Sequence, residues 1–267
     1  MQRAASRARV KLAGIPVDPQ AMLGRALRRG RMLLGRREAA LRGRQERELL
    51  ARLAQGVDRV ALETARKELE PYAPGPEGAI KYFDVDHYLR VNLRRALALG
   101  LHRSRPLRVL DLGCGFGYFL YTCGRFGHDA HGLDFADGNF PFAARCYERS
   151  IGILGQRRVL HRIEPFGALP DLGGPFDLVT AFQICFDAHA SEKRWGGAEW
   201  RHFLGELRRR LAPDARVHLE LNAAPDGELF SPELRSTLLS LGARIRNHVV
   251  SFDRAAKLPC APGKGGS

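Results

Sequence analysis

A turn rich in glycine is the feature of this sequence that points most directly to chemistry. Gly113, Gly115 and Gly117 occupy alternate positions after an apolar stretch that contains Asp111. Glycine permits a positive φ and lets a ligand approach the backbone without a Cβ in its path. The dinucleotide pattern G-x-G-x-x-G fails because Tyr118 stands where the last glycine is required, and no Gly-Lys-Ser/Thr completes a phosphate loop. The nearby acid disfavours phosphate, so the turn suits a ligand with a cationic or hydrogen-bond-donating group.

A second acid stands at the end of the next apolar stretch. Asp134 lies 23 residues beyond Asp111 and is followed by Phe135. A carboxylate presents two acceptor oxygens, so it can bind both hydroxyls of a vicinal diol such as a ribose. A helix N-cap is the alternative interpretation of Asp134, because Asp is a favoured residue at that position.

The stretch 109–117, VLDLGCGFG, resembles motif I of the class I S-adenosylmethionine-dependent methyltransferases. The resemblance covers residues 107–253 and implies that S-adenosyl-L-methionine is the cofactor. It implies that the glycines shape the turn against the methionine and sugar, that Asp111 orients the amino end, and that Asp134 binds the ribose. The acid that the family commonly carries after the third strand is absent, and Glu164 and Phe166 take its place. The residues assigned to cofactor binding are Asp111, Gly113, Cys114, Gly115, Gly117, Asp134, Phe135, Glu164, Phe166 and Phe182.

The candidates for the acceptor site follow the fourth and fifth expected strands. Gln183 and Asn222 stand at adjacent strand ends and are predicted, together with Trp195, to contact the acceptor. His189 is the candidate general base, which a hydroxyl acceptor needs because its pKa is high. The N/D-P-P-Y/F and Pro-Cys sequences of amino-group and cytosine-C5 transfer are absent, and Cys185 is interpreted as a small buried hydrophobe.

The five cysteines do not predict a metal site. They form no C-x-x-C pair, and none lies near a histidine at zinc-ligand spacing. We therefore expect no metal and a reduced, cytoplasmic chain.

The elements that must position these residues are short strands alternating with helices after Pro106. This alternation predicts a mostly parallel sheet covered by helices on both faces, with ligands beyond the carboxyl ends of its strands. Only one clear strand pattern follows Leu241, so we expect six strands in the sheet, or seven if a further closing strand is present. The expected strands are 107–112, 129–134, 159–163, 176–182, 216–222 and 243–252, and the expected helices are 117–126, 140–151, 199–211 and 232–241. The predicted fold class is α/β, a Rossmann-like sheet with flanking helices, preceded by a helical N-terminal region.

The N-terminal region is predicted to hold two amphipathic helices, at 46–70 and 89–101. An aromatic group that includes Tyr82, His87 and Tyr88 lies in this region, and core or lid packing is favoured over substrate contact. The predicted organisation has four parts: a basic, flexible arm at 1–44, a helical region and lid at 45–105, a methyltransferase domain at 106–253, and a flexible tail at 254–267.

The net charge of +14 belongs mainly to the arm. The first 47 residues hold 13 Lys or Arg and three acids, which leaves the other 220 residues only mildly basic. Arginine clusters can neutralise phosphates, but this segment has no aromatic residue on which a base could stack. The charge therefore supports nucleic-acid binding only as a property of the arm.

The function predicted from these residues is methyl transfer from S-adenosyl-L-methionine to a small-molecule or saccharide-type acceptor. One alternative is an RNA or protein methyltransferase that uses the basic arm. Another is a non-catalytic subunit that binds the cofactor beside a partner. No apolar run approaches the ~18 residues of a membrane span, so none is expected, and the oligomeric state is left open.

Overall fold

The structure is a computed structural model, which describes residues 10–12, 15–17, 43–73, 78–135, 141–184, 195–222 and 230–260. The chain divides into two compact units, Met1–Ala51 and Arg52–Ser267. In the first unit, β1 (Val10–Leu12) pairs with β2 (Ile15–Val17) as an antiparallel ribbon, and residues 43–51 are helical. The rest of the predicted basic arm lies outside the described residues.

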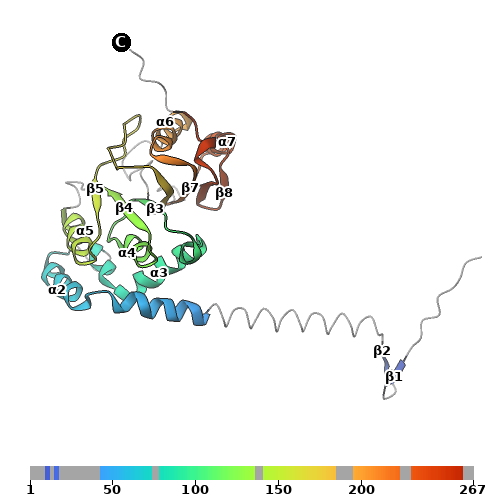
Figure 1. Ribbon diagram of the computed structural model, residues 1–267, viewed down its shortest axis with the longest axis horizontal. Coiled ribbons are helices and arrows are strands. Elements are labelled where there is room, and N and C mark those ends of the chain that lie inside the picture. Colours follow the sequence, from blue (N-terminus) through green and yellow to red (C-terminus); the bar gives the residue numbers. More distant parts are fainter. Residues whose placement is uncertain are drawn as a thin grey trace, which may run out of the picture. The chain divides into compact units, whose positions relative to one another are not determined.

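A seven-stranded sheet forms the centre of the second unit (Figure 1). Its strand order is β5-β4-β3-β6-β7-β9-β8, in which the first five run parallel and β9 runs antiparallel to both neighbours. This confirms the predicted Rossmann-like, mostly parallel sheet. The strands are β3 (Arg108–Leu112), β4 (Asp129–Asp134), β5 (Arg158–Leu160), β6 (Phe176–Ile184), β7 (Leu211–Leu221), β8 (Arg244–Arg246) and β9 (Val249–Phe252).

Helices cover both faces of this sheet. Successive residues of a strand point to opposite faces, so each central strand packs against helices on both sides. Val109 and Leu178 pack with α3 and α4, whereas their neighbours Leu110 and Val179 pack with α6 and α7. The helices are α2 (Arg59–Leu69), α3 (Val85–Ala98), α4 (Tyr118–Arg125), α5 (Pro141–Ile153), α6 (Gly197–Arg208) and α7 (Pro232–Ser240), with short 3-10 segments η1 (Glu70–Tyr72), η2 (Ala79–Phe83), η3 (Leu101–Arg103) and η4 (Ala255–Lys257). None of the helices within the described ranges is both long and apolar enough to cross a membrane.

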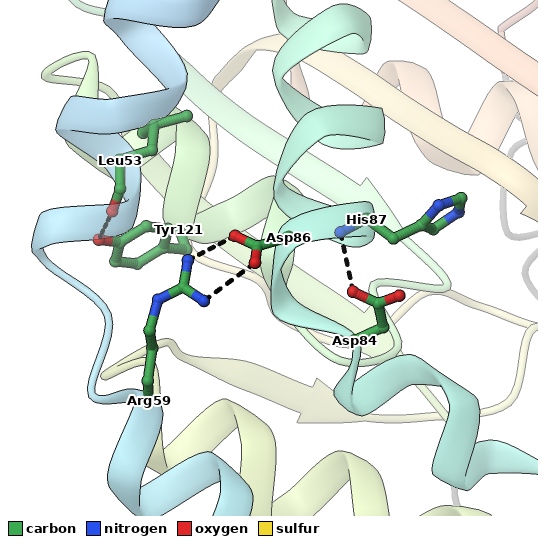
Figure 2. Close-up of polar contacts among 6 residues, drawn as sticks. All are labelled: Leu53, Arg59, Asp84, Asp86, His87 and Tyr121. Atoms are coloured by element: carbon green, nitrogen blue, oxygen red, sulfur yellow. Dashed lines mark hydrogen bonds and ion pairs between the residues drawn. The ribbon is translucent and has the colours of Figure 1, made fainter.

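The single helix predicted over 46–70 is wrong, because the chain breaks at residues 56–58. The helical residues end at 55, and α2 begins after Asp58, whose side chain accepts a hydrogen bond from the Ala61 N–H. Gly56 allows the break to sit against α4, since a Cβ there would lie 2.5 Å from the Tyr121 hydroxyl. That hydroxyl donates to the Leu53 carbonyl at 2.8 Å (Figure 2).

Polar contacts also join α2 to α3. Arg59 donates two hydrogen bonds to the Asp86 carboxylate, at 2.5 and 3.2 Å (Figure 2). Asp84 caps α3 by accepting from the His87 N–H at 3.0 Å, and the His87 ring extends away from this cap. The start of α3, which lines the site described below, is therefore fixed from both sides.

The crossover from β5 to β6 contains no helix. Residues 161–175 run as a loop, and Leu169 and Leu172 of this loop are buried in the same core cluster as α6. The loop thus fills part of a layer that a crossover helix would otherwise cover. β5 itself is a three-residue edge strand on which Val159 and Leu160 are exposed.

Two predicted boundaries at the end of the chain differ from the structure. The strand expected over 243–252 is a hairpin of β8 and β9, because the chain turns at Asn247, whose φ is 51°. The flexible tail expected from residue 254 begins too early. Ala255 and Leu258 are buried in the core, and Arg208 donates to the Leu258 carbonyl.

Candidate functional site

A pocket of about 730 Å³ lies at the carboxyl ends of β3, β4, β6 and β7, against α3. This is where a parallel sheet of this kind places its ligands. The structure brings together there most of the predicted site residues, namely Asp111, Gly113, Cys114, Gly115, Gly117, Asp134, Phe135, Phe182, Gln183 and Asn222.

The glycine turn forms one wall of the pocket with bare backbone. Gly113, Gly115 and Gly117 have φ values of 69°, 50° and 81°, a region that favours glycine. A Cβ on Gly113 would lie 2.5 Å from the Ile184 side chain, so this glycine is also required for packing. A Cβ on Gly115 would meet nothing within 4 Å, which leaves the backbone there open to a ligand. Gly117 is the N-cap residue of α4.

Asp134 joins the glycine turn to the end of β4. Its carboxylate accepts a hydrogen bond from the Gly115 N–H at 2.7 Å and another from the Phe135 N–H at 2.9 Å. Burial raises the pKa of Asp134, and these two hydrogen bonds oppose the rise. The Cys114 thiol also donates to Oδ2, at 3.9 Å, whereas Oδ1 keeps a further lone pair, so the carboxylate can still accept from a hydroxyl of a ligand.

Asp111 is buried within β3 below the turn. Thr180, its partner on β6, donates a hydrogen bond to the carboxylate at 2.6 Å. Burial raises the pKa of Asp111 to about 7, while the Thr180 hydrogen bond and the nearby charge of Arg95 lower it. This acid can therefore complement a positive charge or gain a proton near neutral pH.

The end of β6 is distorted where it meets the pocket. The pairing of β6 with β7 shifts between Phe182 and Ile184, and Gln183 has a φ of 55°. The Asn222 side-chain amide donates to the Gln183 carbonyl at 2.6 Å and holds this conformation. A bulge of this kind redirects a side chain and is common beside functional sites.

The wall formed by η2 and α3 carries pocket residues that were not assigned to the site from the sequence. Tyr82, His87, Tyr88 and Arg95 line the pocket from this side. Tyr82 and Tyr88 lie with ring centroids 4.9 Å apart, and His87 meets Tyr88 edge to face at 4.8 Å. Three of them belong to the aromatic group noted in the sequence, for which packing is the favoured interpretation, whereas no sequence pattern singles out Arg95. Tyr147 and the residues after β5, His161, Arg162 and Ile163, also line the pocket.

Three predicted site residues do not line the pocket. Glu164 is exposed and pairs with Arg162 at 3.1 Å, and Phe166 is 56% exposed. Trp195 is buried and packs edge to face with Trp200. His189, the candidate base, lies outside the described residues. Over the part of the chain that is described, no group of three or more metal-ligating side chains occurs.

The family model for a methyltransferase domain matches residues 84–258, more than half of the chain. The chain therefore belongs to this methyltransferase family. It is an enzyme of the class I type, and its cofactor is S-adenosyl-L-methionine.

Curated relatives match a shorter stretch. The ubiquinone biosynthesis O-methyltransferases of Azorhizobium caulinodans and Ruegeria pomeroyi are 34% and 33% identical over 87 residues. These matches cover 33% and 32% of this chain, and the chain spans about a third of the length of each relative (32% and 33%). A solved amino pentose methyltransferase from Micromonospora echinaspora is 27% identical, with a TM-score of 0.37 over 53% of both chains.

The pocket is chemically suited to this cofactor. S-adenosyl-L-methionine carries a sulfonium, an ammonium and a ribose diol. The buried carboxylates of Asp111 and Asp134 complement positive charge and hydroxyl donors, and the open backbone at Gly115 lets the ligand approach closely.

Proposed function

We propose that the enzyme transfers a methyl group to a small-molecule acceptor, a saccharide-type hydroxyl compound included. The observation that carries this proposal is that Gln183 and Asn222 line the same pocket as the predicted cofactor residues, and its volume of about 730 Å³ falls in the range of about 300–1,000 Å³ typical of small-molecule sites. The curated relatives are named as O-methyltransferases of ubiquinone biosynthesis, which supports a small-molecule acceptor.

We assign the cofactor to the end of the pocket that is lined by the two acids and the glycine turn. Asp134 would accept from the ribose hydroxyls while it holds the Gly115 and Phe135 amides. The turn at Gly113–Gly117 would hold the methionine and sugar, and Asp111 would complement the amino group. Phe182 and Cys114 complete the lining on this side.

The acceptor end lies where β6 and β7 end. Gln183 and Asn222 supply polar groups there, and the Asn222 side chain is held by donating to the Gln183 backbone carbonyl. When bound, the cofactor supplies an electrophilic methyl group, so the contribution of these residues is to hold the acceptor close and in line. A hydroxyl acceptor also needs a base, and His189 stays the predicted one.

The test is transfer of labelled methyl groups from S-adenosyl-L-methionine into a lysate separated into small-molecule, RNA and protein fractions. We expect label in the small-molecule fraction with the wild type and none with Gly115→Arg, which fills the pocket. Gly127→Arg is the matched control, because Gly127 has a similar φ of 84° and open surroundings but does not line the pocket. Label confined to RNA or protein would contradict the proposal.

No observation of the described residues favours the alternatives. The RNA or protein methyltransferase depends on an arm that lies mostly outside them, and the non-catalytic subunit has no support in the comparisons. The expected cytoplasmic location stays a prediction.

A further inference from the structure

His87 presents an imidazole to the pocket from the first turn of α3. Its backbone N–H donates to the Asp84 carboxylate at 3.0 Å, and its ring extends away from this cap (Figure 2). The ring meets the Tyr88 ring edge to face, with the centroids 4.8 Å apart. The turn that carries His87 is also tied to α2 by the hydrogen bonds of Arg59 to Asp86. The imidazole is therefore supported by an aromatic neighbour on a fixed helix start and is open to solvent.

The packing of α3 puts this imidazole at the acceptor end of the pocket. Ala96 of α3 belongs to the same core cluster as Phe182 of β6. The next residue of β6 is Gln183, which we assign to the acceptor. His161, the other histidine among the described lining residues, follows β5, and its N–H donates to the Asp134 carbonyl at 2.7 Å. Because the strand order is β5-β4-β3-β6, His161 stands at the cofactor end, away from β6.

The other ionisable groups that line the pocket are less suited to take a proton from an acceptor. Asp134 holds two backbone amides, and Asp111 is buried below the glycine turn, where it accepts from Thr180. Burial raises the pKa of three phenols, which therefore keep their protons, namely Tyr88, Tyr118 and Tyr147. An imidazole has a lone pair in its neutral form and is the side chain that exchanges a proton near neutral pH.

The exposure of His87 matters for the balance of protons in the reaction. Methyl transfer to a hydroxyl breaks the acceptor O–H bond and the S–CH₃ bond and forms an O–CH₃ bond, while the electron pair of the S–CH₃ bond returns to sulfur. Each turnover thus releases one proton. A base that takes this proton must pass it to water before the next turnover, and a solvent-exposed ring can do so directly.

We propose that His87 is the general base of the acceptor site, which takes the proton of an acceptor hydroxyl and releases it to water. Tyr88 positions the ring for this task. The inference rests on the proposed function, because a hydroxyl is the kind of acceptor that requires a base. His189, the base predicted from the sequence, lies outside the described residues and is the competing candidate in the test.

The first measurement is the rate of labelled methyl transfer into the small-molecule fraction of a lysate, between about pH 6 and pH 9. We expect His87→Ala to lose about 100- to 10,000-fold in rate at neutral pH, the range that a general base contributes. Added imidazole should restore part of the rate. The variant keeps the backbone N–H that caps α3, and it should bind S-adenosylhomocysteine normally in calorimetry. His248→Ala is the matched control, because His248 is half-exposed beside Glu220 and does not line the pocket.

The pH profile carries a separate expectation. The wild-type rate should rise with pH as the imidazole loses its proton, and the residual rate of His87→Ala should lack this limb. The ionisable groups around His87 on the same wall are Lys81 and Tyr82 of η2, Asp84 and Tyr88 of α3, and Tyr118 of α4. All of them remain in the variant, so the lost limb would belong to His87.

The second measurement needs no turnover. 4-Nitrophenol, whose absorbance reports its ionisation, is titrated into wild type and His87→Ala, each loaded with S-adenosylhomocysteine. The wild type should ionise the bound phenol at a lower pH than water does, because the imidazole accepts the proton. His87→Ala should not.

The outcomes separate this proposal from the proposed function. A normal rate in His87→Ala would overturn the proposal, and a loss in His189→Ala instead would assign the base to His189. Weaker S-adenosylhomocysteine binding by His87→Ala, or a lost rate that imidazole does not restore, would show a structural role and overturn it too. A wild type that labels no small molecule would refute the proposed function. The phenol titration then still decides on His87, and equal spectra of the two proteins would reject it.

Discussion

Asp134 combines a structural and a binding role in one side chain. It holds the amides of Gly115 and Phe135 and still faces the pocket. We expect Asp134→Asn to weaken S-adenosylhomocysteine by about 10- to 100-fold, because charge-assisted hydrogen bonds are lost and the new amide opposes one N–H donor. Calorimetry measures this loss. Asp129→Asn, at the other end of β4 and outside the pocket, is the matched control and should bind normally. Equal affinities of all three proteins would contradict the role.

Asp111 makes stability depend on pH. Its pKa is about 7 in the folded protein against an ordinary value of 3.8, so the folded state binds a proton that the unfolded state releases. The stabilisation is therefore complete below about pH 4 and is lost as pH rises toward 7, by up to about 1.4 kcal/mol per pH unit. Urea unfolding of wild type and Asp111→Asn across this range measures the difference. Thr180→Val should extend the loss to higher pH, since it removes a hydrogen bond that lowers the pKa.

The site residues that could be predicted from the sequence are those whose role requires a particular backbone conformation. Gly113 and Gly115 need positive φ, and Asp134 must end a strand, so spacing along the chain discloses them. Arg95 and Tyr88 lie on a helix, where a polar residue facing a pocket has the same spacing as one facing water. Only the packing of α3 against the sheet distinguishes them.

At the level of elements, the contact of Tyr121 with the N-terminal helices matters more than the ion pair beside it. The Tyr121 hydroxyl is buried against the Leu53 carbonyl, whereas Arg59 and Asp86 are 45% and 64% exposed. We expect Tyr121→Phe to lower the free energy of unfolding by about 1 kcal/mol, since it removes a buried hydrogen bond and leaves the Leu53 carbonyl with only the Gly56 N–H as a donor. Asp86→Ala should cost less, between about 0 and 1 kcal/mol, because exposed ion pairs contribute little. Chemical denaturation compares the two, and the reverse order would contradict this account.

The same elements show where sequence patterns reach their limit. The apolar periodicity of 46–70 continues through Gly56 and Asp58, so the sequence pattern gives no sign of the break at 56–58. The structure explains the break, because Tyr121 occupies the space that a side chain at position 56 would need. The stretch 243–252 contains enough apolar residues, among them Ile245, Val250 and Phe252, to suggest one strand, and the turn at Asn247 has no glycine to mark it. The parallel core was predictable because β3 and β6 are apolar and buried, and helices separate most of the parallel strands along the chain.

For the whole molecule, the charge and the pocket belong to different parts of the chain. The pocket is lined by residues between Lys81 and Asn222, whereas most of the net charge lies in the first 47 residues. We expect a protein without residues 1–42 to bind S-adenosylhomocysteine normally. Any salt-sensitive binding to RNA should be lost, because it depends on the basic segment. Calorimetry and filter binding at several salt concentrations test both statements, and unchanged RNA affinity would refute the second.

The edge strand β5 affects how readily the protein self-associates at high concentration. An unpaired strand edge offers its backbone to other chains, and the exposed Val159 and Leu160 would be covered in such a pairing. Three residues of length and the adjacent arginines oppose this self-association, since charge flanking an apolar strand acts as a gatekeeper against aggregation. The arginine-rich composition thus protects solubility at this edge, and a neutral residue at the exposed Arg157 would weaken that protection without touching the pocket.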